Sequence, residues 1–348
     1  NPSSILAERA IRFGRVSVYE AICVLLSTIA VAVIAWFLRS AEALAWGLLF
    51  GALMRTLLSY FFFSSPKVPK FNMAYQLEML SVAKHFAVIA AGTLIMAQGD
   101  NLIIGALEGS QLLGVYVLAY QFADFPVQFL REIANRVALP VLSSLQVDRE
   151  RLRTVLLDIM QIQLAIIIPF VVVAYVFAHE LIVTLYGTKW AAAGVVLQAL
   201  MLVILGKGLT HVCVPYITGT GAFSFASRMK IFETSLFLVC VYFGARYFSL
   251  VGGACGAGIG YMAAGIGRLI FICKDVELPF FKTMRLALVP PVLAVFPGVL
   301  MARFIADTVV WGNVIELIVI VSIVCISYVA VSFFVQKELR YVLLRFRS

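Results

Sequence analysis

The sequence carries little charge. Only 13% of its 348 residues are Asp, Glu, Lys or Arg, whereas 63% are hydrophobic, and the mean hydropathy is +1.02. Soluble domains carry about a quarter charged residues. This shortage excludes a water-soluble enzyme and a soluble nucleic-acid-binding protein, and it predicts a chain that crosses a bilayer several times.

The sequence also lacks the short motifs of known enzyme classes. His179-Glu180 has no second histidine at the HExxH spacing, and neither GxSxG nor the Walker loop GxxxxGK[ST] occurs. The six cysteines form no CxxC pair and lie in apolar segments, so we interpret them as small buried hydrophobes without a disulfide framework or a metal site. We therefore expect no catalytic residue and no cofactor.

Long apolar segments dominate the sequence instead. A helix needs roughly 20 mostly apolar residues to cross the hydrocarbon core. Ten segments reach this length: residues 21–38, 42–63, 81–107, 112–145, 159–178, 190–218, 231–248, 247–267, 286–304 and 317–336. The alternating pattern of a β-barrel is absent. The predicted fold class is an all-α integral membrane bundle with about ten transmembrane helices.

The net charge of +9 is distributed unevenly between the ends of these segments. If residues 1–17 are cytoplasmic, 18 of the 27 Lys and Arg residues, Lys230 and Arg268 among them, fall on the cytoplasmic side. Four fall on the other side and five lie within helices. This bias follows the positive-inside rule and predicts that both ends of the chain are cytoplasmic. The charge is thus a topology signal, and we expect no nucleic-acid partner.

The chain contains an internal repeat at an offset of 213 residues. The helix pair of residues 18–63 falls on the pair of residues 231–276, and three charges stay in register: Arg15, Glu20 and Arg55 with Arg228, Glu233 and Arg268. We therefore expect the last two helices of an N-terminal lobe (1–74), a six-helix C-terminal lobe (75–276) and two additional helices (277–348). The repeat also predicts about 140 further residues and four helices before Asn1. Gly252, Gly256 and Gly260 form GxxxG spacings, which we interpret as helix packing.

Polar side chains recur inside the predicted helices, where an ionisable group costs roughly 2.5–3.5 kcal/mol on insertion scales. One helix face carries a stripe at steps of three or four residues: Gln121, Asp124, Gln128, Arg131 and Asn135. The same segment also carries Arg136, and other helices add Asp100, Lys207 and His211. Two interpretations stay open, namely ion pairs that only orient helices and a water-filled cavity. The stripe as a whole favours the cavity.

Several motifs resemble those of bacterial polysaccharide transporters. The stretch DNLIIG at residues 100–105, followed by LGVY at 113–116 and Ala119-Tyr120, is similar to the seventh and eighth helices of oligosaccharide flippases. PVLS at 140–143 with residues 148–153 resembles a loop of that family, and LYGTKW at 185–190 resembles its motif before helix ten. These flippases are a branch of the multidrug/oligosaccharidyl-lipid/polysaccharide exporter superfamily. The resemblance implies a 14-helix bundle with two pseudo-symmetric lobes, like that of MATE transporters and lipid flippases.

The resemblance also implies a function. Members of this flippase family move undecaprenyl-pyrophosphate-linked oligosaccharide repeat units across the bacterial inner membrane for surface polysaccharide biosynthesis. The resemblance implies membrane lipids and the polymerase and export machinery as further partners. It would place basic residues near the pyrophosphate: Arg55, Arg131, Arg136 and Lys207. Gln121, Gln128 and Asn135 would line the same cavity, and Asp100 and Asp124 are candidates for a coupled proton or cation.

Three alternatives remain at this stage. A multidrug-type antiporter would favour an aromatic, carboxylate-bearing pocket for cations. A membrane polysaccharide polymerase or ligase should carry a large outer loop with paired catalytic residues, but the longest outer connection runs only from about His179 to Lys189. A chain with one incomplete lobe could also be an inactive structural partner.

Overall fold

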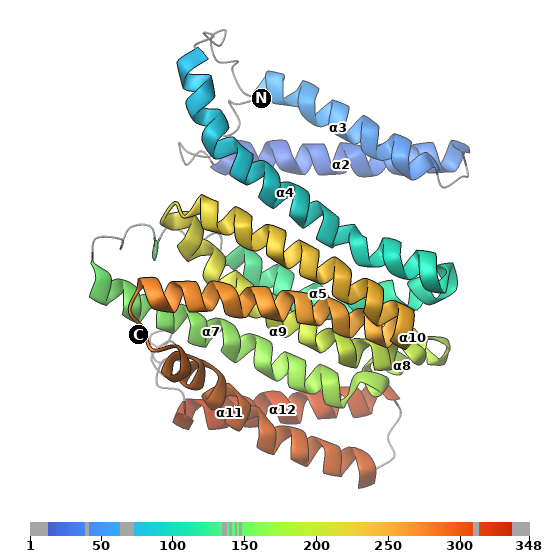
Figure 1. Cartoon of the computed structure of the whole chain (residues 1–348). Coiled ribbons are helices and arrows are strands. Elements are labelled where there is room, and N and C mark those ends of the chain that lie inside the picture. Colours follow the sequence, from blue (N-terminus) through green and yellow to red (C-terminus); the bar gives the residue numbers. More distant parts are fainter. Residues whose placement is uncertain are drawn as a thin grey trace. The chain divides into compact units, whose positions relative to one another are not determined.

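Every regular element that the computed structural model describes is a helix (Figure 1). The description covers residues 13–38, 42–62, 73–133, 138, 141–142, 145, 148–308 and 313–335. The elements are α2 (Phe13–Leu38), α3 (Glu42–Phe62), α4 (Met73–Glu108), α5 (Ser110–Ile133), α7 (Arg149–Val176), α8 (Ala178–Tyr186), η2 (Thr188–Trp190), α9 (Ala192–Gly219), α10 (Phe223–Asp275), α11 (Phe280–Thr308) and α12 (Asn313–Val335).

Each of the ten predicted segments overlaps one of these helices. Within the described residues, six helices are long and apolar enough to cross a membrane, namely α2, α4, α7, α9, α10 and α11. The chain is therefore a multi-pass helical membrane protein, and the count of ten crossings stays a prediction. The predicted outer connection between His179 and Lys189 is itself mostly helical, because α8 and η2 occupy it.

The chain divides into two compact units, at Leu77–Glu78. In the first unit, α2 and α3 pack as an antiparallel pair: Gly47 meets Val31 and Gly51 meets Ser27. The Tyr19 hydroxyl donates to the carbonyl oxygen of Arg55 (2.7 Å). Close backbone approach at small residues is the usual way that membrane helices associate.

The second unit is built around α9. This helix packs against α5, α7, α8 and α10 (Figure 1), and most of its side chains are buried. Gly206 permits close approach of two backbones, because a Cβ there would lie 2.6 Å from the backbone of Tyr261 and Met262. On the far side of α7, α11 and α12 form a further pair, and the Tyr328 hydroxyl donates to the Ala165 carbonyl (2.6 Å). These contacts fix the helices that surround the candidate site.

Helix α10 is a hairpin of two antiparallel arms, residues 223–247 and 250–275. The backbone leaves helical geometry at Phe248 and at Ser249, whose φ is +55°. Glycines of the second arm then pack on the backbone of the first, Gly256 against Cys240 and Gly260 against Phe237. Both arms exceed the length of a membrane crossing. The packing interpretation of the GxxxG spacings agrees with this geometry.

Gly256→Ala should destabilise this hairpin. A Cβ on Gly256 would lie 2.2 Å from the Cys240 carbonyl oxygen, so the arms would have to separate, at a cost of about 2–3 kcal/mol. Chemical unfolding in detergent micelles measures the loss. Gly114→Ala is the matched control: a Cβ there has no atom within 4 Å, and alanine favours a helix by about 0.5–1 kcal/mol. Equal stability of the two variants would contradict the hairpin packing.

Polar contacts join the ends of the helices. Arg153 donates to Glu277 (2.6 Å) and Arg149 to the Asp275 carbonyl (2.9 Å), while Arg303 pairs with Glu180 (2.9 Å). In each case the two partners belong to connections that the predicted topology places on the same side of the membrane.

Two residues of the same count are buried inside a helix. Lys230 and Arg268 lie inside α10, with exposed fractions of only 8% and 5%. They do not belong to loops, because a buried carboxylate inside the hairpin holds both of them. Without these two residues the predicted cytoplasmic side would still carry 16 basic residues, against 4 on the other, so the prediction does not depend on them.

The cysteine interpretation was also incomplete. All six cysteines are free, and Cys23, Cys213 and Cys273 are buried as expected. Cys325, however, is exposed, and Cys240 and Cys255 are half-buried. In the described part of the chain no group of His, Cys, Asp and Glu is arranged to hold a metal ion.

Candidate functional site

A cavity of about 520 Å³ lies within the second unit, between α4, α5, α9 and both arms of α10. Its lining comes from the C-terminal halves of α5 and α9 and from the arm ends of α10 opposite the Phe248–Ser249 turn. It therefore occupies one half of the unit, toward the turn between α9 and α10. Four basic and two acidic side chains line it: Arg131, Lys207, Lys230 and Arg268, with Asp124 and Glu233.

Lys207 lies near the middle of α9 at the inner end of this cavity. Its ammonium group forms an ion pair with Asp124 of α5 and donates to the Tyr120 hydroxyl (2.8 Å). The same nitrogen lies 4.7 Å from the Tyr120 ring centroid and 5.3 Å from that of Tyr261. Cation–π contacts of this kind hold a lysine in one position. The side chain keeps 13% of its surface exposed, so the charge is accessible from the cavity.

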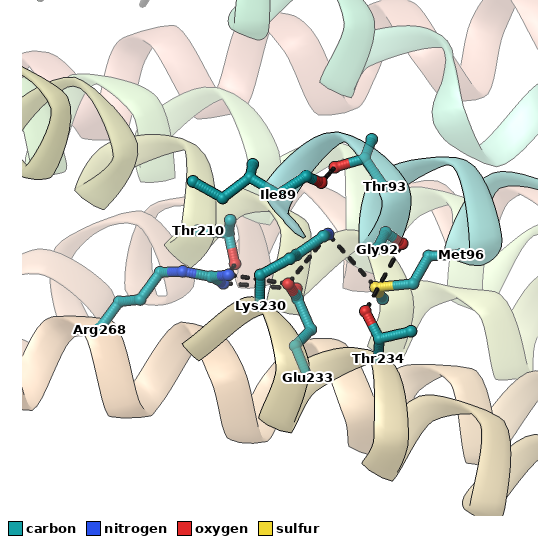
Figure 2. A network of polar contacts seen from close by, with 9 residues as sticks. All are labelled: Ile89, Gly92, Thr93, Met96, Thr210, Lys230, Glu233, Thr234 and Arg268. Atoms are coloured by element: carbon teal, nitrogen blue, oxygen red, sulfur yellow. Dashed lines mark hydrogen bonds and ion pairs between the residues drawn. The ribbon is translucent and has the colours of Figure 1, made fainter. Parts of the chain in front are cut away.

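Glu233 organises a second polar group, shown in Figure 2. Arg268 spans both of its carboxylate oxygens at 3.3 and 2.7 Å, and Lys230 donates to one of them at 3.1 Å. Arg268 also donates to the Thr210 hydroxyl (3.1 Å). The Glu233 side chain is 1% exposed. A buried charge is tolerable only when it is paired in this way.

The wall formed by α4 is tied to α10 by side chains. Lys230 donates to the Met96 sulfur (3.3 Å), and His85 Nδ1 lies 2.8 Å from the Ser227 hydroxyl. Gly92 permits this approach, since a Cβ there would lie 2.8 Å from the Lys230 side chain (Figure 2). The aromatic rings of Phe86 and Phe223, both in the lining, are 4.9 Å apart.

The structure brings together part of the predicted set. Gln128, Arg131, Asp124 and Lys207 line the cavity, and Gln128 donates to Asp124 (3.2 Å). Gln121 is exposed on α5 outside the lining.

Three further residues of the predicted set remain. Arg55 belongs to the first unit, where it lines a groove between α2 and α3. Asn135 and Arg136 lie outside the described residues.

Asp100 lies one layer behind the cavity. It is 2% exposed, and its carboxylate accepts hydrogen bonds from the Tyr116 hydroxyl (2.8 Å) and the Asn101 backbone N–H (2.9 Å). The Tyr116 ring packs 5.9 Å from that of Tyr120, which faces the cavity. Asp100 is therefore connected to the lining through tyrosines and does not belong to it.

Sequence reasoning missed Lys230, Glu233 and Arg268 as cavity residues. A signal for two of them was present, because Glu233 and Arg268 are charges inside apolar segments that stay in register in the repeat. The aromatic residues Tyr120 and Tyr261 gave no such signal, since aromatic residues are common throughout membrane helices.

Comparisons with known sequences agree on one family. A sequence profile described as "Polysaccharide biosynthesis protein" matches residues 1–195. The lipopolysaccharide biosynthesis protein WzxC of Escherichia coli K12 is 24% identical over 265 residues, which are 75% of this chain and 53% of the relative. The succinoglycan biosynthesis transport protein ExoT of Rhizobium meliloti is 24% identical over 216 residues, 61% of this chain and 43% of the relative. The chain thus spans about half the length of the curated relatives it matches.

A comparison of structures identifies the fold. The lipid II flippase MurJ in an inward closed conformation aligns with a TM-score of 0.69 at 15% sequence identity. The alignment covers 90% of this chain and 66% of MurJ. The helices thus have the arrangement seen in a lipid flippase.

Proposed function

The chain belongs to the polysaccharide biosynthesis protein family, and from this premise we propose that the intact protein is a flippase. It moves undecaprenyl-pyrophosphate-linked oligosaccharide repeat units across the bacterial inner membrane, with its C-terminus cytoplasmic, for the synthesis of a surface polysaccharide. It acts as a transporter and not as an enzyme. The family assignment confirms the resemblance of its motifs, and the names of WzxC and ExoT support a role in polysaccharide synthesis and transport.

The observation that carries the proposal is the excess of basic groups in the cavity of the second unit. Four basic side chains face two carboxylates there, and His211 adds no charge when neutral. A pyrophosphate linkage is anionic and cannot enter hydrocarbon, whereas the lipid tail can remain in it. Basic groups compensate the phosphate charge most strongly where water is scarce. Arg55 and Arg136 remain proposed contributors to the same path.

Transport follows from alternating access between two lobes, with the polar head group in the cleft. We also propose that the intact protein has 14 helices in two lobes and two additional helices, and that the boundaries between these parts lie after residues 74 and 276. Asp124 is the stronger candidate for ion coupling, because it lines the cavity and pairs with Lys207. Asp100 stays a candidate behind the tyrosine layer.

Two rival functions fit the cavity less well. A multidrug-type antiporter for cations would need excess negative charge, but the described lining has twice as many basic as acidic groups. A polymerase or ligase would need paired catalytic residues in a large outer loop, whereas the connection after α7 holds only α8 and η2 before α9 begins.

Gene deletion followed by complementation tests the proposal. A strain without the gene should lose surface polysaccharide and accumulate the lipid-linked oligosaccharide in the cytoplasmic leaflet. The wild-type gene should restore the polysaccharide and abolish the accumulation, but Arg131→Ala should do neither, because Arg131 is an exposed basic group of the lining. Membrane immunoblots control for protein level. Accumulation in the periplasmic leaflet would contradict flippase activity, and full rescue by Arg131→Ala would remove that residue from the site.

A further inference from the structure

Glu233 differs from the other paired carboxylates of the described residues. It contacts two cations, Arg268 and Lys230, while Asp124, Glu180 and Glu277 each form an ion pair with one. It is also the most buried of these carboxylates. Glu233, Lys230 and Arg268, here called the Glu233 group, all line the cavity.

The donors around Glu233 are those that a phosphate group would use. A guanidinium binds the two oxygens of a phosphate in the same bidentate manner as those of a carboxylate, and a lysine ammonium serves as a point charge. Arg268, on the second arm of α10, donates one N–H group to each oxygen of Glu233. Lys230, on the first arm, donates to one of these oxygens. The donors that surround Glu233 are therefore of the kinds that bind a phosphate group.

The second contact of the Lys230 ammonium group indicates that this lysine can be redirected. Besides Glu233, its ammonium group contacts the Met96 sulfur at 3.3 Å, and a thioether is a weak acceptor. A phosphate oxygen in place of the sulfur would give Lys230 an ionised acceptor instead of a weak neutral one. Thr210 keeps Arg268 in position during the exchange through its own hydrogen bond.

We propose that Glu233 is an internal counter-ion, which a phosphate of the substrate displaces from Lys230 and Arg268. This inference rests on the proposed function and deepens it, because it defines the substrate class as lipid head groups with an anionic diphosphate. When the substrate leaves, Glu233 pairs with both cations again. The exchange keeps the basic groups compensated in both states. While the substrate is bound, the displaced and buried Glu233 carboxylate lacks its cations, and this cost prevents the cavity from holding the substrate too tightly.

Direct binding to the intact protein in lipid nanodiscs tests the proposal, with a C15 isoprenyl diphosphate as the probe. Glu233→Gln removes the competing carboxylate and keeps its shape, so binding should tighten by about tenfold, the equivalent of ~1.4 kcal/mol. If Glu233 only orients the two cations, the same substitution should weaken binding. Glu180→Gln is the matched control, because it breaks a carboxylate–arginine pair outside the cavity, and it should leave affinity unchanged.

Thermal melting shows whether Glu233→Gln is folded. If it is not, Glu233→Asp decides the question: the shorter carboxylate keeps the charge but holds the two cations less well, and binding should still tighten. Weaker or unchanged binding in the folded variant would overturn the displacement. Failure of the wild-type protein to bind the diphosphate would instead contradict the proposed function, so the two failures are distinguishable.

Discussion

Lys207→Met is expected to reduce export of surface polysaccharide by about 100-fold. Lys207 is the basic group at the inner end of the cavity, held between Asp124 and the rings of Tyr120 and Tyr261. Charge-assisted hydrogen bonds contribute about 1.5–3 kcal/mol each, and a loss of ~2.8 kcal/mol corresponds to 100-fold. Quantifying surface polysaccharide in a complemented deletion strain measures the effect.

Lys189→Met provides the control for this substitution. Lys189 also lies over an aromatic ring, 5.3 Å from the centroid of Trp190, but it belongs to η2 and not to the cavity. Its replacement should leave export near the wild-type level. The double variant Lys207→Met with Asp124→Asn removes the unpaired carboxylate, and it should stay inactive even when its abundance is normal. Normal export by this double variant would show that Lys207 contacts no substrate.

Arg268→Ala is expected to cause the largest loss of stability, about 3 kcal/mol or more. The substitution removes three hydrogen bonds and leaves Glu233, 1% exposed, with Lys230 as its remaining cation. Breaking a buried ion pair from one side typically costs 3–5 kcal/mol. Chemical unfolding in detergent micelles, compared with wild type, measures this change.

Arg303→Ala is the corresponding control for an exposed pair. Arg303 and Glu180 are 46% and 29% exposed at the side chain, so solvent screens their attraction and the loss should stay below about 1 kcal/mol. Equal losses from the two variants would mean that the Glu233 group does not stabilise the hairpin of α10.

The helices could be predicted from the sequence because a bilayer leaves few other options. A backbone in hydrocarbon must satisfy its hydrogen bonds internally, so long apolar segments form helices. The segments 231–248 and 247–267 were predicted as separate helices, and the turn at Phe248–Ser249 lies where they meet. The boundary between helices that follow one another along the chain could therefore be predicted from the sequence.

The site was harder to predict because its contacts join distant parts of the chain. Lys207 and Asp124 are 83 residues apart, and Arg268 and Glu233 are 35 apart across the hairpin. Helical spacing could place Asp124, Gln128 and Arg131 on one face, but it could not show which other helix faces them. Lys230 and Arg268 were counted only as basic residues of the cytoplasmic side, because a positive-inside count uses position along the chain and contains no information on ion pairs.

The most direct test of the account is whether water and an anionic lipid share the cavity. In a protein whose native cysteines are replaced by serine, Val214→Cys places a thiol in the lining, and Val239→Cys places one on the exposed surface of α10 outside it. A charged thiol reagent should modify Val214→Cys, the isoprenyl diphosphate should protect it, and Val239→Cys should stay unmodified in nanodiscs. An unreactive thiol at position 214, or a reaction there that the diphosphate does not slow, would contradict a hydrated, phosphate-binding cavity.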